Sequence, residues 1–301
     1  MNSPFTLRTD LYPAIDPDSL KGSLTGLNAL VTGSSKGIGK QIAIALATAG
    51  ANVCITARNA YQVEGTRKEI SERVPNVKII GITTDVLKLE EQEKLVHEFH
   101  DKLGPVDILI CNAGDNTFQP FHLTDAKSWW DLNEINVRAP VELTRLVYED
   151  FRSRNSGSIV YTSSRAAAHD LPYTTAYNCA KTSITRFAGT LQAGLNMVQK
   201  IEKGVDNGVS VYSIHPGEIS TDLHKKGLPQ NVVEKAPYVG ELMAKLREVR
   251  PKFQAALPAW TVVWLCAGKA PALRGKFVDC TRDVTEQAEA AAAGKLELSV
   301  H

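Results

Sequence analysis

The sequence has few cysteines and no long apolar run, and each of these shortages excludes a class of protein. The five cysteines lie far apart, so their spacing predicts neither a disulfide framework nor a zinc site. The seven histidines are equally dispersed, and we expect no metal centre. No apolar stretch approaches the roughly 18 residues that a membrane span needs. The densest late one, TVVWLCA, indicates a buried helix.

The N-terminus and the charge balance exclude further classes. The first residues lack the basic start and apolar core of a signal peptide. Hydrophobic residues make up 43% of the chain and charged residues 22%, as in ordinary soluble globular proteins. The net charge is +1 and the cations are scattered, which gives no electrostatic footprint for nucleic acid or an anionic membrane. We therefore expect a cytoplasmic protein with neither of these partners.

Short β-rich runs alternate with longer segments of helical period along most of the chain. The intervening segments are about 15 to 25 residues long, enough for crossover helices. Seven such runs predict an α/β fold of the Rossmann type, a doubly wound seven-stranded parallel sheet with helices on both faces. The predicted strands span residues 28–32, 52–56, 77–83, 106–112, 157–163, 208–215 and 275–280.

No break in composition interrupts this series, so we expect a single domain over residues 26–281. Residues 1–25, punctuated by Pro and Asp, are expected to form an extended arm, and residues 282–301 a C-terminal tail. Residues 222–258 resemble an insertion before the last strand. Their mix of Leu, Val, Tyr and Pro predicts a largely apolar lid over a small-molecule site.

The first strand runs directly into TGSSKGIGKQIAIALATAG, in which three glycines precede a helix. Gly33, Gly37 and Gly39 let the backbone turn sharply and approach a pyrophosphate, whose charge meets the N-terminus of that helix. The spacing Gly-x-x-x-Gly-x-Gly differs from the common Gly-x-Gly-x-x-Gly fingerprint. The strand before it and the helix after it are nevertheless the context that a dinucleotide site requires.

The end of the second strand indicates which dinucleotide is bound. At this place an acidic side chain usually takes the ribose 2′-hydroxyl, whereas an arginine accommodates a 2′-phosphate. This chain has Ala57 followed by Arg58, and Lys36 in the glycine turn adds a second cation. Either cation alone could be an ordinary surface residue. Together they predict NADP(H).

Further motifs follow in the order and at the intervals of one family. They are TTDV, CNAG, NEINVRAP, SIVYTSS, YNCAK and HPGEIST. With the glycine turn, they resemble the classical short-chain dehydrogenase/reductase family over about residues 25–281. The DLYPAID arm and the ALRGKFVDC ending resemble a fungal branch of that family, in which many members modify secondary metabolites.

The resemblance implies a set of cofactor-binding residues. Asp85 and Val86 would contact the adenine, and Ile219 and Thr221 would touch the nicotinamide end. Cys111 departs from the family, which usually has Asn there, while the next three residues keep the part that faces the cofactor. The full implied set is Gly33, Ser35, Lys36, Gly37, Ile38, Gly39, Arg58, Asp85, Val86, Asn112, Ala113, Gly114, Arg138, Tyr177, Lys181, Pro216, Gly217, Ile219 and Thr221.

The resemblance also implies a catalytic set of Asn136, Ser164, Tyr177 and Lys181. Tyr177 and Lys181 are four positions apart, so both lie on one face of a helix, and Ser164 precedes Tyr177 by the usual 13 residues. Tyr177 would exchange the proton, while Lys181 would lower the pKa of the phenol and bind the nicotinamide ribose. Ser164 would hold the substrate oxygen, and Asn136 would anchor a water that leads the proton to solvent.

Several neighbours have simpler interpretations. Ser163 is expected to complete the strand, and His215, before a turn, to be structural. Tyr173 and Phe118 flank the expected pocket but are interpreted as packing residues. For Asn136 taken alone, the sequence leaves open a helix-interior amide that the backbone satisfies.

These features predict an NADP(H)-dependent oxidoreductase that transfers a hydride between nicotinamide and a small-molecule ketone or secondary alcohol. Two alternatives stay open: a catalytically silent dinucleotide-binding regulator, and a recruited non-redox enzyme on the same fold. The family usually forms dimers or tetramers through two long helices, expected here near residues 128–151 and 177–199. We therefore expect a homodimer or homotetramer. The sequence does not specify the substrate.

Overall fold

Short runs of aliphatic and β-branched residues pair into one parallel sheet in the computed structural model, which describes residues 3–221, 227–249 and 253–296. The strands within these residues are β1 (Asn28–Thr32), β2 (Asn52–Ala57), β3 (Ile79–Thr83), β4 (Ile108–Cys111), β5 (Gly157–Thr162), β6 (Val209–His215) and β7 (Phe277–Asp279). They lie in the order β3-β2-β1-β4-β5-β6-β7, and every neighbouring pair is parallel. The predicted Rossmann-type sheet is confirmed.

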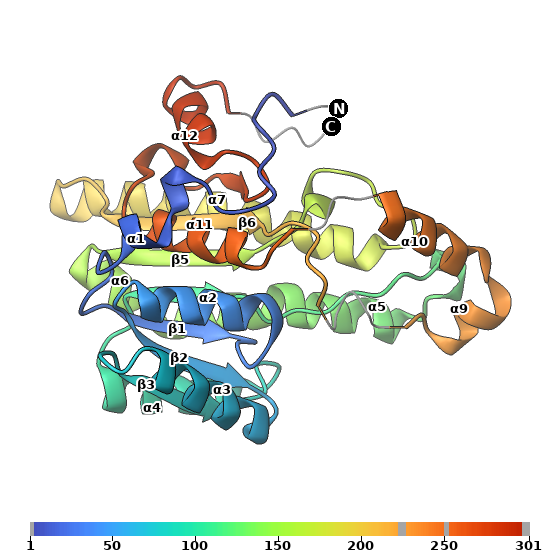
Figure 1. Cartoon of the computed structure of the whole chain (residues 1–301), viewed down its shortest axis with the longest axis horizontal. Coiled ribbons are helices and arrows are strands. Elements are labelled where there is room, and N and C mark those ends of the chain that lie inside the picture. The colour runs from blue at the N-terminus through green and yellow to red at the C-terminus, as the bar shows by residue number, and fades with distance from the viewer. Residues whose placement is uncertain (1–2, 222–226, 250–252, 297–301) are drawn as a thin grey trace.

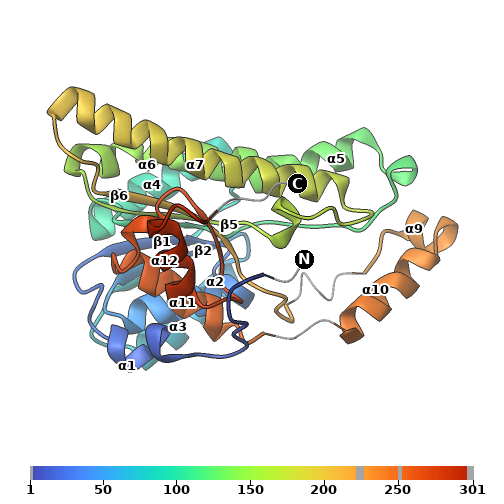
Figure 2. The same cartoon turned by 90° about the horizontal axis from the view of Figure 1, so that it is seen from above.

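Helices cover both faces of this sheet, as predicted. Figure 2 shows α2, α3 and α11 on one face and α4, α6 and α7 on the other. The longer helices are α2 (Gly37–Thr48), α3 (Ala60–Arg73), α4 (Leu89–Leu103), α5 (Ala126–Asn133), α6 (Ala139–Arg154), α7 (Thr175–Lys203), α10 (Tyr238–Val249), α11 (Ala256–Cys266) and α12 (Val284–Ala292). The apolar run TVVWLCA lies in α11 and at its end, and the helix is buried on all sides.

The two faces of the sheet belong to two separate apolar cores. Along β1, Ala29 and Val31 pack into the core beneath α2 and α11, whereas Leu30 packs into the core beneath α4, α6 and α7. This alternation follows from the two-residue period of a strand. All five residues of β1 are buried, as expected for a central strand of a sheet covered on both faces. The strand order reverses between the neighbouring strands β1 and β4, and ligands bind at this switch point in such folds.

The N-terminal arm and the C-terminal tail pack against this domain and against each other. The arm contains two short helical segments, η1 (Pro13–Ile15) and α1 (Pro17–Leu20), that the sequence did not predict. Its apolar side chains join the core under α11. Arg8 forms an ion pair with Asp283 at 2.6 Å, just before α12. Figure 1 shows the arm beside the tail.

The segment interpreted as a lid is mostly helical where it is described. Residues 222–226 and 250–252 lie outside the described residues. Between them, α9 (Gln230–Lys235) and α10 form two helices, which we call the cover helices. They lie beyond the carboxyl ends of the strands, at the same end of the molecule as the start of α7 (Figures 1 and 2). No helix in the described part of the chain is both long and apolar enough to cross a membrane.

Candidate active site

The turn between β1 and α2 has a shape that only glycine permits. Gly33 and Gly37 have φ angles of +62° and +59°, in the left-handed region that side chains rarely adopt. A Cβ atom on Gly39 would lie 2.4 Å from the carbonyl oxygen of Gly33 and 2.4 Å from Asn112 Nδ2. The helix therefore begins against the turn itself, with its first N–H groups at the carboxyl edge of the sheet.

The start of α2 fits an anion. Its N-cap residue is Lys36, whose side chain has no acceptor for the helix N–H groups, and both Lys36 and Gly37 are exposed. The N-terminal N–H groups and the helix dipole suit a phosphate, so these residues fit the pyrophosphate of a dinucleotide. Ser35 is buried behind the turn, where its carbonyl accepts from Thr66 Oγ1 at 2.9 Å.

A second glycine turn comes close to the first. Thr221 Cγ2 would lie 3.4 Å from a Cβ atom on Gly37, so the HPGEIST segment reaches the edge of the cofactor turn. Gly217 has a φ of +93°, and a Cβ atom there would lie 3.0 Å from the Phe253 ring. Pro216 and Ile219 are buried in the same segment. Residues far apart in the sequence thus gather at one edge, as their implied role in cofactor binding requires.

The cations of the predicted 2′-phosphate site lie at that edge too. Arg58 directly follows β2 and is exposed, as is Lys36, and the strand end carries Ala57 rather than an acid. Arg138 is also exposed but is engaged with protein groups. It pairs with Glu134 and donates from Nη2 to the Leu87 carbonyl at 3.3 Å. It therefore braces the loop that carries Asp85 and Val86.

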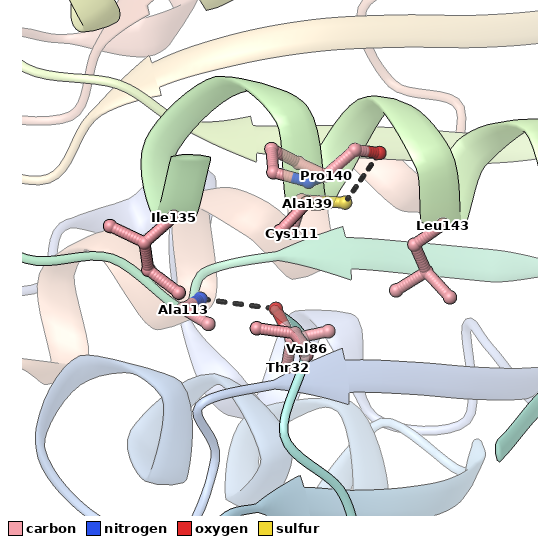
Figure 3. Close-up of a pocket in the computed structure, with 8 residues that line it drawn as sticks. All are labelled: Thr32, Val86, Cys111, Ala113, Ile135, Ala139, Pro140 and Leu143. Carbon is pink, nitrogen blue, oxygen red and sulfur yellow. Dashed lines mark hydrogen bonds between the residues drawn. The ribbon is translucent and has the colours of Figure 1, made fainter. Parts of the chain in front are cut away.

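Figure 3 shows a small pocket between that loop and α6. Val86 and Ala113 line it together with Cys111, whose thiol contacts the Pro140 carbonyl oxygen at 3.9 Å. Burial raises the pKa of the Cys111 thiol to about 12, so the group stays protonated and behaves as a small apolar side chain. Replacement of the usual family Asn leaves the hydrogen bonds of the next residues intact, because Thr32 Oγ1 accepts from the N–H groups of Asn112 and Ala113.

The phenol and the ammonium from YNCAK lie on one buried face of α7. Lys181 Nζ lies 5.4 Å from the centre of the Tyr177 ring and donates to the Thr162 carbonyl at 2.8 Å. Burial lowers the pKa of Lys181 to about 8. Burial also raises the pKa of Tyr177, while a hydrogen bond with Ser164 acts in the opposite direction. The predicted Ser164, Tyr177 and Lys181 are thus brought together.

Asn136 joins them from a segment whose geometry the sequence did not predict. It lies in η3 (Glu134–Arg138), a π-helical segment between α5 and α6, a distortion that is frequent at functional sites. Asn136 Nδ2 donates to the carbonyls of Leu132 and Asp115 at 2.8 and 2.9 Å. Its buried Oδ1 has no hydrogen-bond partner within the described residues. A Cβ atom on Gly114 would lie 2.7 Å from this Oδ1 and 3.6 Å from Lys181 Nζ.

This arrangement suits an ordered water. A buried acceptor without a protein partner is usually satisfied by water, and Lys181 Nζ lies near the same position beside Gly114. The amide is therefore only half satisfied by the backbone, unlike the helix-interior amide that the sequence left open. Asn136 has the geometry to hold a water between Lys181 and solvent.

Two neighbours have structural contacts, as expected, and two further groups were missed. Ser163 Oγ bonds with Thr185 Oγ1 at 2.6 Å inside the core, and His215 Nδ1 accepts from the Arg165 N–H at 3.1 Å. The hydroxyl of Thr32 and the carbonyl of Thr162 belong to the site but are not among the groups that the sequence predicted for it. Because Thr32 is the last residue before the glycine turn, its position in the sequence could have indicated a role at the site. A backbone carbonyl leaves no sequence signal.

A family model described as short chain dehydrogenase matches residues 27–231. The chain belongs to the short-chain dehydrogenase family. A short chain dehydrogenase of Pseudocercospora fijiensis is 33% identical over 98% of this chain and 94% of its own length. Another short chain dehydrogenase, from Monascus ruber, is 26% identical over 93% of this chain and 86% of its own length. Both sources are fungi, in agreement with the fungal resemblance of the arm and the C-terminal ending.

Solved structures of other oxidoreductases share the fold of this short-chain dehydrogenase. A 7α-hydroxysteroid dehydrogenase complexed with NADH is 27% identical, with a TM-score of 0.74. The match covers 88% of this chain and 96% of that one. L-Sorbose reductase from Gluconobacter frateurii, complexed with NADPH and L-sorbose, is 25% identical with a TM-score of 0.72, over 85% of this chain and 95% of that one. The two differ in both cofactor and substrate, so the likeness establishes an oxidoreductase acting on CH–OH or C=O groups and leaves both choices open.

Proposed function

We propose that this short-chain dehydrogenase is an NADP(H)-dependent reductase of ketones, with Tyr177 as the proton donor. The observation that carries the proposal is the position of Lys181 Nζ over the Tyr177 ring, with Ser164 bonded to the same phenol. NADPH, when bound, supplies the hydride. The chain's own residues then have to hold the carbonyl oxygen and deliver one proton to it.

Each residue has a part that its contacts support. Ser164 would donate a hydrogen bond to the substrate carbonyl oxygen and stabilise the charge that develops there. With its raised pKa, the Tyr177 phenol is protonated at neutral pH, as a proton donor to the forming alkoxide must be. Lys181 would stabilise the phenolate that remains. The water on Asn136 Oδ1 would return a proton from solvent.

The proposal is tested by offering the purified protein NADPH and a panel of ketones while following NADPH consumption. We expect turnover of at least one ketone, and Tyr177→Phe should lower it by about 10²–10⁴-fold, because the hydroxyl takes part only in proton transfer. NADPH binding by Tyr177→Phe, measured by fluorescence titration, should stay nearly unchanged. Activity of that variant within tenfold of the parent would show that another group delivers the proton.

A further inference from the structure

A small apolar cluster joins the cover helices to two segments of the site. Val232, Ala236 and Val239 form its buried centre, separate from the two cores of the sheet domain. Its partly buried members include Phe118 and Tyr173. Asn231 Nδ2 also donates to the Leu123 carbonyl at 2.9 Å, which ties α9 to the loop after β4.

Two members of this cluster are close in the chain to Tyr177, the proposed proton donor, and to its neighbour Asp115. Tyr173 precedes Tyr177 by four residues, just before α7 begins. Phe118 follows Asp115 by three residues, and the Asp115 carboxylate is near enough to Tyr177 to raise its pKa. The start of α7 and the cover helices lie at one end of the molecule in both views (Figures 1 and 2). A substrate whose carbonyl meets Tyr177 would therefore extend its body toward the cluster.

Tyr173 has a backbone conformation that tyrosine rarely adopts. Its φ is +66°, and among described non-glycine residues only Asn155 shares a positive φ. Asn155 ends α6 in the left-handed conformation, an ordinary use of asparagine. Tyr173 has no such local reason, and its conformation is held by a hydrogen bond of 2.7 Å from the Gln119 N–H to its carbonyl. Such conformations persist at ligand clamps, where the surrounding structure enforces them.

The aromatic ring explains why a tyrosine occupies this position. The Tyr173 ring meets the ring of Tyr238, the first residue of α10, edge to face with centres 6.1 Å apart and an angle of 61°. Tyr238 remains 47% exposed, so the pair presents an open aromatic surface instead of sealing the cluster. Rings in this geometry offer a negative face and positive edges, which a third aromatic ring complements better than a saturated one.

We propose that the substrates are carbonyl compounds with a flat aromatic body, which lies against Tyr173 and Tyr238 while the C=O reaches Tyr177. This inference rests on the proposed ketone reduction and adds the substrate class to it. It also changes the interpretation of Tyr173 from a packing residue to a specificity residue.

The test compares 2-tetralone with trans-2-decalone, because both place the ketone in the same bicyclic skeleton and only the first carries an aromatic ring. We expect kcat/KM with NADPH to favour 2-tetralone by about 3–10-fold, the size of one aromatic contact. Tyr238→Ala should bring this ratio close to one, and Tyr238→Phe should keep it. Tyr173→Gly, which accommodates the positive φ, should lower the ratio as well. Val233→Ala is the matched control, an exposed apolar residue of α9 outside the cluster, and should leave the ratio unchanged.

Equal efficiencies for the two ketones, or a ratio unaffected by Tyr238→Ala, would overturn the aromatic assignment even if both ketones are reduced. If neither these ketones nor cyclohexanone is reduced, the proposed function fails, and equilibrium binding decides the inference separately. In that case 2-naphthol and 2-decalol are titrated against the protein saturated with NADP⁺. A preference for 2-naphthol that Tyr238→Ala removes would support the aromatic surface, and equal affinities would overturn it.

Discussion

Burial shifts the pKa of each of two proposed catalytic side chains, Tyr177 and Lys181, and so affects the pH range in which each is charged. It raises the pKa of Tyr177, so the phenol holds its proton throughout the neutral range. It lowers the pKa of Lys181 to about 8, so the ammonium is present below that pH and is lost as pH rises through it. The lysine, not the tyrosine, is then the group whose titration falls in the working range.

The pH dependence of ketone reduction should therefore show a fall above about pH 8. Below that value the charged Lys181 supports the phenolate, and above it this support disappears. The quantity to measure is kcat/KM for NADPH-dependent reduction as a function of pH, which reports groups of the free enzyme. Lys181→Arg is the control, because a guanidinium keeps its charge. Its residual activity should lack the break, and a break that persists in Lys181→Arg would assign it to another group.

We propose that single residues also decide the choice between NADPH and NADH. Arg58 offers a planar donor fork suited to a 2′-phosphate, Lys36 offers a second cation, and Ala57 provides no carboxylate to bond a ribose diol or repel a phosphate. Two charge-assisted contacts of roughly 1.5–3 kcal/mol each would favour NADPH over NADH by more than about a hundredfold.

The ratio of kcat/KM for NADPH and NADH measures this preference, and Ala57→Asp with Arg58→Leu should reverse it. The pair of changes removes an attraction and adds a repulsion, and specificity uses both. Arg58→Leu alone serves as the intermediate control. It should lower kcat/KM with NADPH without raising kcat/KM with NADH. A kcat/KM ratio of the parent protein near one, or in favour of NADH, would mean that Arg58 and Lys36 do not contact the cofactor.

At the scale of elements, the sequence predicted what depends on local pattern. All seven strands were found with their ends shifted by at most two residues, because buried parallel strands appear in the sequence as short apolar runs between helices. The glycine turn was equally predictable, since Gly33 and Gly37 need positive φ angles. Motif spacing also indicated the four proposed catalytic side chains, which the structure brings close together.

What the sequence could not predict depends on tertiary contacts. In the π-helical η3, Asn136 bonds across to the Asp115 carbonyl as well as back to Leu132, and only the first of these bonds crosses between segments. Tyr173, with its positive φ, accepts a hydrogen bond at its carbonyl from Gln119, which is distant in the sequence. The pattern of a single helix or loop contains neither contact.

The cover helices should open more readily than the rest of the fold. Their buried centre consists of Val232, Ala236 and Val239, far less apolar surface than α11 buries. Active-site covers come from the low-stability part of a structure. In hydrogen exchange, amides of α9 and α10 should exchange faster than those of α11 without ligands, and slow down when NADP⁺ and a bound alcohol are added. Slow exchange in α9 and α10 without ligands would contradict a role as a lid.

At the scale of the whole molecule, the arm connects the tail to the segment that follows the cover helices. The Tyr12 hydroxyl accepts from the Val284 N–H at 2.8 Å, and Gln254 Nε2 donates to Asp10 at 3.1 Å. Next to Gln254, Phe253 packs against the turn at Gly217. The arm is therefore positioned to steady the residues after the cover helices, where they pack against the turn at Gly217.

The outer faces of the long helices favour an assembly of identical chains. Part of the apolar surface predicted there is used within the chain, because Phe187 and Leu191 pack against the core under α7. Further along the same helix, however, Met197 and Ile201 are 62% and 75% exposed, one helical turn apart. A monomer would leave this surface in water.

We therefore expect a homodimer or homotetramer, in which α7 contributes to the interface. Light scattering at micromolar concentration should give a multiple of the monomer mass, and Met197→Glu with Ile201→Glu should shift it toward the monomer, because two carboxylates would be buried against the partner. Val233→Glu introduces the same charge at an exposed apolar residue of the cover helices and should leave the mass unchanged. A monomeric mass for the parent protein would rule out the assembly. A multimer that survives the double substitution would place its interface elsewhere.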